Sequence, residues 1–240
     1  MGRAIECLLA SAEDFELEYR ADRALEAAMS PPRHGPDLSA VGAGEVVGII
    51  DFSSSGGVIE AAGAAARLRV AMVSGTTGID DEARAALRAA AEVTPVCWSP
   101  NFSLGIPLLT AIVRDLARRL PAEWQIEIAE THHAAKRDAP SGTALRLADA
   151  WRSGRGGRLV HGREGAAGPR TSDEIGIHAI RLGEVVGEHR VLFGGAGEVL
   201  ECLHRVQDRT AFATGSLEAL RRLMRRGPGW YEWEDLLARD

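Results

Sequence analysis

Residues 130–144, which read ETHHAAKRDAPSGTA, bring together side chains that move protons and bind anions. The segment holds two adjacent histidines, His132 and His133, followed by Lys136 and Asp138. Packing of a hydrophobic core does not explain such a group, because burying polar atoms costs free energy unless each one is hydrogen-bonded. Since histidine titrates near neutral pH and lysine supplies a charge or a proton, the segment could perform general acid chemistry on an anionic ligand.

The elements on either side of this segment would hold it in place. Apolar residues alternate over 124–128 (WQIEI), which predicts a strand that delivers the chain to Glu130. Pro140 then ends the regular structure, and Ser141 is a good N-cap for a following helix. The buried side of that helix is expected to consist of Ala144, Leu145, Ala148 and Trp151.

The start of this helix suits a carboxylate. The N–H groups of Gly142 and Thr143 have no partner within the helix, the helix dipole is positive there, and a glycine permits close approach. Two simpler interpretations remain open at this point. The histidines could be surface residues beside a capped helix, or they could be metal ligands, although no third ligand has an evident spacing.

The composition is that of a globular protein with one large domain or two modest ones, since 45 % of the 240 residues are hydrophobic and 26 % are charged. A net charge of -6 argues against nucleic-acid or acidic-membrane partners, so local cations must hold any anion. Cys7, Cys97 and Cys202 stand far apart and form no CxxC pair, so they fit neither a disulfide framework nor a zinc site. We therefore expect the protein to reside in the reducing cytoplasm. No segment approaches the roughly 18 apolar residues of a membrane span.

Strands and helices alternate in the first half of the chain. Buried strands are predicted over 45–53, 69–78 and 93–101, with alanine-rich helices over 58–67 and 80–91. An amphipathic helix over 2–12 and a short strand over 15–22 precede them. This order predicts an α/β fold in which helices wind around a parallel sheet.

The second half reads as a different domain. A long helix is expected over 105–120, and the segments of 175–206 alternate and carry glycine pairs at turns, as antiparallel strands do. Residues 152–158, RSGRGGR, are expected to form a flexible, solvated loop, and a terminal helix is expected over 211–226.

Polar residues and glycines follow the predicted parallel strands. Residues 51–53 (DFS) and 75–78 (GTTG) lie just past carboxyl ends, the edge at which open α/β sheets bind ligands. Taken alone, the GTTG segment is only a turn. Asp22 and Arg23, after the strand at 15–22, could bind ribose hydroxyls and a 2′-phosphate, or could be a solvated charge pair.

These segments together resemble the 4-hydroxy-tetrahydrodipicolinate reductase family, formerly called dihydrodipicolinate reductase, of the diaminopimelate route to lysine. The matching segments are EIAETHHAAKRDAPSGTA, SGTTGID, SPNFSLG, GREG, IGIHAIRLGEVVGEH and DRTAFATGSLEAL, and they span essentially the whole chain. The resemblance implies a Rossmann-like dinucleotide-binding domain over 1–103 with 209–240. It also implies an α+β substrate-binding and tetramerisation domain over 104–208, with a mainly antiparallel sheet.

The resemblance further implies an activity and a set of site residues. NADPH or NADH would transfer hydride to a small cyclic imine dicarboxylate, giving tetrahydrodipicolinate after loss of water, in a cytoplasmic homotetramer. His132 would be the catalytic proton donor or acceptor and Lys136 its partner acid, while His133, Gly142 and Thr143 would bind substrate. The residues implied to contact the cofactor are Met1, Asp22, Arg23, Gly75, Thr76, Thr77, Ser99, Pro100, Asn101 and Phe102.

The resemblance departs from the family at the start of the chain. Family members begin with a strand and a glycine-rich turn, whereas this sequence opens at MGR, inside that motif. The resemblance therefore implies that the first strand and most of the pyrophosphate loop are missing from this sequence. Either the true start lies upstream of Met1, or the product is truncated and its dinucleotide binding is impaired. The alternatives are a non-catalytic oligomeric relic and an amino-acid dehydrogenase built on the same two-domain plan.

Overall fold

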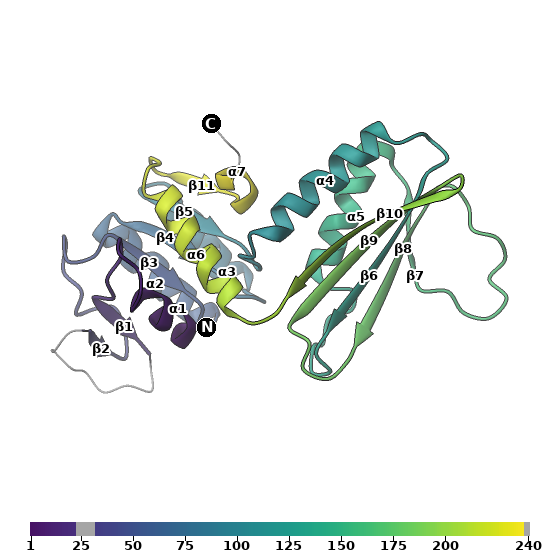
Figure 1. The fold of residues 1–240 in the computed structure, drawn as a ribbon. Helices are drawn as coiled ribbons and strands as arrows, with labels where there is room; N and C mark the ends of the chain where they lie inside the picture. Colours follow the sequence, from purple (N-terminus) through teal and green to yellow (C-terminus); the bar gives the residue numbers. More distant parts are fainter. Residues whose placement is uncertain (23–31, 238–240) are drawn as a thin grey trace. The chain divides into compact units, whose positions relative to one another are not determined.

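The computed structural model describes residues 1–22 and 32–237, so Arg23 lies outside the described residues. The chain divides into two compact units, whose helices and strands are labelled in Figure 1. Unit 1 consists of Met1–Phe102 with Thr210–Asp240, and unit 2 consists of Ser103–Arg209. Each unit has its own sheet and its own core.

A parallel sheet forms the centre of unit 1. Its strands are β3 (Gly48–Asp51), β4 (Ala71–Ser74), β5 (Pro95–Trp98) and β11 (Gly229–Tyr231), in the order β11-β5-β4-β3. Every pairing is parallel, and all four residues of β4 are buried. The α/β fold with a wound parallel sheet, predicted from the alternating elements, is confirmed.

Helices cover both faces of this sheet. Met72 and Val96 pack against α2 (Ser55–Leu68) and α3 (Asp81–Ala91). Their neighbours Val73 and Cys97 point to the opposite face, because side chains alternate along a strand, and pack against α6 (Thr210–Leu223) and α7 (Trp233–Leu237). The sheet is therefore buried on both sides, as its near-continuous apolar strands require.

Local sequence signals set the starts of the two covering helices. The Ser54 side chain caps α2 by accepting from the N–H of Gly57, and the Asp80 side chain caps α3 by accepting from the N–H of Ala83. Both helices begin within three residues of the predicted positions. Serine and aspartate are preferred at N-caps because their oxygens satisfy amides that have no intrahelical partner.

Three short elements open unit 1. They are α1 (Gly2–Leu9), β1 (Tyr19–Ala21) and β2 (Arg33–Gly35). The helix ends three residues earlier than the predicted 2–12, and the strand is shorter than the predicted 15–22. In the described part of the chain, β1 pairs in parallel with β2 and belongs to a different sheet from β3.

Unit 2 is a five-stranded sheet with two helices on one face. The strands are β6 (Gln125–His132), β7 (Arg158–His161), β8 (Glu174–Arg181), β9 (Gly187–Gly195) and β10 (Glu198–Val206), in the order β10-β9-β6-β8-β7. Ile126 and Ile128 of β6 are fully buried against α4 (Gly105–Arg119) and α5 (Gly142–Arg155). Trp151 of α5 contacts Phe193 of β9, with ring centroids 5.5 Å apart.

Two local expectations for unit 2 differ from the structure. The antiparallel prediction holds for β9 and β10, but β8 pairs in parallel with β6 and β7 and gives a mixed sheet. The segment 152–158 is not a loop, because α5 continues to Arg155 and β7 begins at Arg158. Arg155 donates to the main-chain oxygen of Ala117 at 2.6 Å, so α4 holds the end of α5 in helical form.

On the other face of this sheet, the half-buried Glu127 is the centre of a network of ion pairs. The Glu127 carboxylate accepts from Arg163 at 2.9 and 3.1 Å, from Arg170 at 3.0 Å and from Nε2 of His178 at 2.7 Å. Burial alone would raise the pKa of Glu127, but the hydrogen bonds from these partners lower it to about 2. Glu127 is therefore ionised over the whole physiological pH range.

Among the described residues, no helix is both long enough and apolar enough to cross a membrane.

Candidate active site

The polar cluster of unit 2 lies where β6 ends and α5 begins. Glu130 is fully buried at the end of β6, and His132 follows on the same side of the strand. One Glu130 oxygen lies 2.5 Å from Nδ1 of His132, and the other accepts the backbone N–H of Ser141 at 3.1 Å. A single carboxylate thus links the predicted proton-transfer residue to the start of the helix.

Burial controls the charge of His132. It lowers the pKa of His132, and the neighbouring Glu130 carboxylate only partly opposes this effect, while Lys136 and Arg181 add to the lowering. His132 is therefore mostly neutral at pH 7 without a ligand. A bound dianion would shift the balance towards the protonated form, because nearby negative charge favours imidazolium.

Lys136 and His133 occupy the loop that follows. The Nζ atom of Lys136 forms an ion pair with Asp138 at 2.8 Å, and its backbone N–H donates to the carbonyl of His133 at 3.1 Å. Lys136 is the single lysine among the 28 lysine and arginine residues of the chain. An arginine stays charged at all accessible pH values, whereas a lysine can release its proton.

The N-terminus of α5 has the predicted form. Ser141 Oγ accepts the N–H of Ala144 at 3.2 Å, as an N-cap should. The N–H groups of Gly142 and Thr143 belong to the first turn of the helix, which contains no acidic residue. A Cβ added to Gly142 would meet nothing within 4 Å, so there is room for a ligand beside the backbone.

Two further residues of this cluster were not predicted from the sequence. Arg181, at the end of β8, donates to both Glu130 oxygens at 2.9 and 3.0 Å. His189 of β9 lies opposite Glu130 in the register, and its ring centroid is 5.2 Å from that of His132. The alternation that buries Ile128 also points Glu130 inward, and a buried glutamate requires a cationic partner, so the sequence signalled such a partner without indicating that it is Arg181.

In unit 1, polar groups gather at the carboxyl ends of the parallel strands. The Asp51 carboxylate is buried and accepts from Oγ of Ser74 at 2.7 Å, from Oγ1 of Thr76 at 2.7 Å and from Oγ of Ser53. The indole of Trp98 donates to the Thr76 carbonyl at 3.0 Å. These bonds fix the turns after β3, β4 and β5 relative to one another.

The predicted cofactor residues Gly75, Thr77, Pro100 and Ser99 lie in the turns at this edge. The Gly75 N–H is bound to the Asp51 carbonyl at 2.8 Å, and a Cβ at Gly75 would lie 2.1 Å from the Phe52 ring, so only glycine fits there. Thr77 and Pro100 are exposed, and Ser99 Oγ accepts the Asn101 N–H. The Asp51 carboxylate is buried and accepts from three hydroxyl groups, so its oxygens are engaged within the protein and not turned towards a ligand.

The remaining predicted cofactor residues, Phe102, Met1 and Asp22, differ in burial and lie in different parts of unit 1. Phe102 is buried in the core beside Trp233, so its ring is not available to a ligand. Met1 is the N-cap of α1, whose first turn contains no acidic residue. Asp22 is exposed after β1, and its N–H donates to the Gly35 carbonyl at 2.9 Å.

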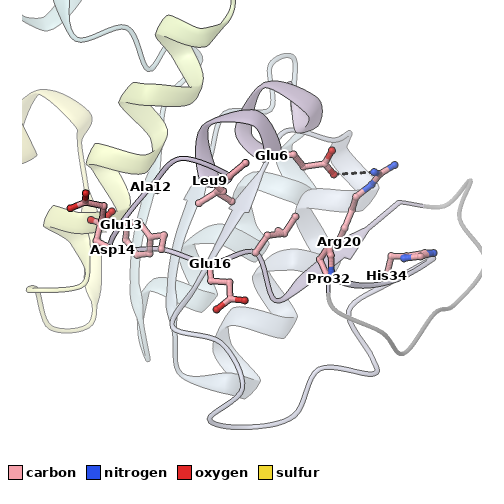
Figure 2. Close-up of a pocket in the computed structure, with 12 residues that line it drawn as sticks. Glu6, Leu9, Ala12, Glu13, Asp14, Glu16, Arg20, Pro32 and His34 are labelled. Atoms are coloured by element: carbon pink, nitrogen blue, oxygen red, sulfur yellow. Dashed lines mark ion pairs between the residues drawn. The ribbon is translucent and has the colours of Figure 1, made fainter.

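A cavity of about 830 Å³ lies beside α1 and β1 in unit 1 (Figure 2). Its lining carries four carboxylates, of Glu6, Glu13, Asp14 and Glu16, against Arg20 and His34. Glu6 and Arg20 already form an ion pair at 3.0 Å. Asp14 is paired with Arg221 at 2.9 Å, which leaves Glu13 and Glu16 as the carboxylates of this lining without an ion pair among the described residues.

In the ranges that the structure describes, no group of three or more histidine, cysteine or acidic side chains is arranged to hold a metal ion.

A wound parallel sheet with polar turns at its carboxyl edge, together with a second unit in which histidines and a lysine lie beside a helix N-terminus, is typical of oxidoreductases that use NADH or NADPH. Two family models match the chain, dihydrodipicolinate reductase N-terminus over residues 1–102 and dihydrodipicolinate reductase C-terminus over residues 105–237. The chain belongs to the dihydrodipicolinate reductase family. The resemblance seen in the sequence is confirmed.

Individual relatives agree with this assignment. A 4-hydroxy-tetrahydrodipicolinate reductase of Thermomicrobium roseum is 42% identical over 99% of this chain and 95% of its own length. One of Rubrobacter xylanophilus is 50% identical over 69% of this chain and 65% of its own length. The dipicolinate-bound dihydrodipicolinate reductase of Paenisporosarcina sp. TG-14 has the same fold, with a TM-score of 0.76, 24% identity and coverage of 99% and 95%. None of these supports a non-catalytic relic.

Proposed function

We propose that the chain catalyses the NAD(P)H-dependent reduction of 4-hydroxy-tetrahydrodipicolinate to tetrahydrodipicolinate in lysine and diaminopimelate biosynthesis. The observation that carries the proposal is the single Glu130 carboxylate that joins His132 to the N-terminus of α5. A proton donor and a carboxylate-binding amide turn are thereby held together in unit 2. Such a pair suits a dicarboxylate that must gain a proton.

The residues of unit 2 would bind the substrate and supply its proton. The first amides of α5, at Gly142 and Thr143, bind one substrate carboxylate, and His133 contributes to substrate binding. The substrate charge raises the pKa of His132, so His132 becomes protonated when substrate binds. His132 and Lys136 then supply the proton at the reacting ring, and Lys136 balances negative charge.

Unit 1 would hold the cofactor at the carboxyl edge of its sheet. Gly75, Thr76 and Thr77, with the turn 99–102, would lie along the dinucleotide, while Met1 and Asp22 would contact its pyrophosphate and adenosine portions. When bound, the reduced nicotinamide supplies a hydride to the ring carbon of the substrate as water is lost. The fixed turns after β3, β4 and β5 orient the ligand, because their hydroxyl groups are bonded to Asp51.

An assay of the purified chain tests this function. Addition of 4-hydroxy-tetrahydrodipicolinate to the protein and NADPH or NADH is expected to cause substrate-dependent loss of the reduced-cofactor absorbance, with tetrahydrodipicolinate as the product. Mixtures that lack the substrate or the protein are the controls. If neither cofactor is oxidised above these controls, the proposed activity is wrong.

Arg23 is the proposed reader of the cofactor 2′-phosphate. Charge-assisted bonds to a phosphate are worth about 1.5 to 3 kcal/mol, so Arg23→Ala should raise KM for NADPH about tenfold or more relative to KM for NADH. Steady-state kinetics with each cofactor measures the ratio. Arg20→Ala is the matched control, because Arg20 is paired with Glu6 at 3.0 Å. Equal effects of Arg23→Ala on both cofactors would show that this arginine does not read the phosphate.

The assembly is proposed to be a homotetramer in the cytoplasm. The strand β10 exposes Val199, Leu200 and Leu203 on unit 2, with exposed fractions of 68%, 40% and 46%. Apolar side chains gathered on one strand favour burial against another subunit. This supports unit 2 as the tetramerisation domain as well as the substrate-binding domain.

A further inference from the structure

Glu130 is the most completely bonded carboxylate in the cluster at the end of β6. It is fully buried, and an ionised carboxylate in that environment is costly unless its oxygens are paired. Arg181 supplies a two-pronged pair at 2.9 and 3.0 Å, Ser141 supplies a backbone N–H, and His132 approaches at 2.5 Å. Burial would raise the pKa of Glu130, but hydrogen bonds from Arg181 and His132 hold it below its ordinary value.

An ionised Glu130 determines which nitrogen of His132 carries a proton. A carboxylate only accepts hydrogen bonds, so Nδ1 of His132 must be the donor. The proton that His132 gains or loses is then the one on Nε2. A Cβ added to Gly187 would lie 3.2 Å from this Nε2 atom, so the glycine leaves the reactive edge of the ring uncrowded.

The second imidazole of the cluster does not compete for this role. His189 lies beside His132, and its Nε2 is 3.2 Å from Oγ of Ser141. Burial lowers the pKa of His189 to about 3, and the neighbouring His132 and His204 rings add to the lowering whenever they are protonated. His189 therefore stays neutral, and the charged groups that face His132 are Glu130, Lys136 and Arg181.

We propose that Glu130, held by Arg181, is a positioning residue that fixes the tautomer of His132 and couples that ring to the N-terminus of α5. Removal of Glu130 would free the ring to adopt the other tautomer, which directs a proton away from the reacting edge. The coupling through Ser141 would also loosen, because the same carboxylate holds both. The kinetic part of this inference rests on the proposed function of His132.

Glu130→Gln tests the proposal because it keeps the shape of the side chain and removes the charge. We expect kcat to fall about 10- to 100-fold, the usual effect of losing the outer hydrogen-bond partner of a working imidazole, with a smaller change in KM. The pKa of His132, followed by NMR of the ring nitrogens, should fall by about one unit or more because an opposite charge has been removed. The limb of the pH–rate profile assigned to His132 should move to lower pH by the same amount.

Glu127→Gln is the matched control. Glu127 lies on the same strand, has arginine and histidine partners, and points to the opposite face of the sheet from Glu130. We expect Glu127→Gln to leave kcat and the His132 titration unchanged, even if it lowers the thermal midpoint. Equal kcat and equal His132 titration in the parent and Glu130→Gln would show that Glu130 is structural only.

A second variant and a substrate-free measurement test the role of Glu130 even if Glu130→Gln does not fold or the parent chain is inactive. If Glu130→Gln does not fold, Glu130→Asp retains the charge facing Arg181 but shortens the reach to His132, and it should still change the tautomer ratio and kcat. An unchanged tautomer ratio and kcat in Glu130→Asp would overturn the proposal. The NMR measurement needs no substrate, so it decides the positioning role even if the parent chain fails to reduce 4-hydroxy-tetrahydrodipicolinate and the proposed function is wrong.

Discussion

Replacement of Lys136 by Met, or of His132 by Gln, is expected to lower kcat by about 10²- to 10⁴-fold, the usual contribution of a positioned proton donor. The fold should survive both changes. Asp138, the partner of Lys136, is 57% exposed, and exposed ion pairs contribute at most about 1 kcal/mol to stability. Steady-state rates at saturating cofactor and substrate measure the effect, and circular dichroism checks the fold.

The chain offers a matched control for each of these variants. His178→Gln removes another histidine that is bonded to a glutamate, at 2.7 Å from Glu127, on the opposite face of the sheet. Arg152→Met removes a surface cation that is paired with Asp149 at 3.0 Å. Both controls should retain the parent rate. If His132→Gln and Lys136→Met also stay within about threefold of the parent, the loop has no part in proton transfer.

Gly215→Ala is expected to lower the free energy of unfolding by about 1 to 3 kcal/mol or more, the usual cost of overpacking a core. A Cβ at this position in α6 would lie 1.6 Å from the carbonyl oxygen of Phe102, and a backbone atom cannot rotate away as a side chain can. The helix or the turn 99–102 must move. Because that turn belongs to the proposed cofactor edge, KM for NADPH should rise as well.

The sign of this prediction is opposite to the general rule for glycine in helices. Gly63, in α2, is exposed, and a Cβ there would meet nothing within 4 Å, so Gly63→Ala should stabilise the protein by about 0.4 to 1 kcal/mol. Urea unfolding of the parent and the two variants, measured side by side, gives both values. An increase in stability for Gly215→Ala would show that α6 does not pack against the Phe102 backbone as closely as the structure indicates.

Helices that are defined by their own caps and apolar spacing could be predicted from the sequence. Strands that form only by pairing with a segment far away in the sequence could not. The helices after Ser54 and Asp80 have strong caps and regular apolar spacing, so their positions could be inferred. The strand β11 has only three residues and exists because Gly229 pairs with Pro95, far away in the sequence. No local pattern distinguishes such a segment from a turn.

The same division applies to the candidate site. His132, Lys136 and the cap at Ser141 are close in sequence, and their residue types alone indicated proton transfer beside an anion-binding turn. Arg181 and His189 reach Glu130 only through the register of β6 with β8 and β9. Alternation predicts which face a residue occupies but not which residue of another strand lies opposite, so these partners required the structure.

The unique lysine of the loop has a practical chemical consequence. Because Lys136 is the only lysine in the chain, the only amino groups available for covalent labelling are its Nζ atom and the α-amino group of the first residue. Lys136 retains an exposed side-chain fraction of 22%, so a small alkylating or isotope-bearing reagent can reach it. A methyl group introduced by reductive alkylation would therefore act as a spectroscopic reporter at the proposed substrate loop, without any need to remove competing lysines by mutagenesis.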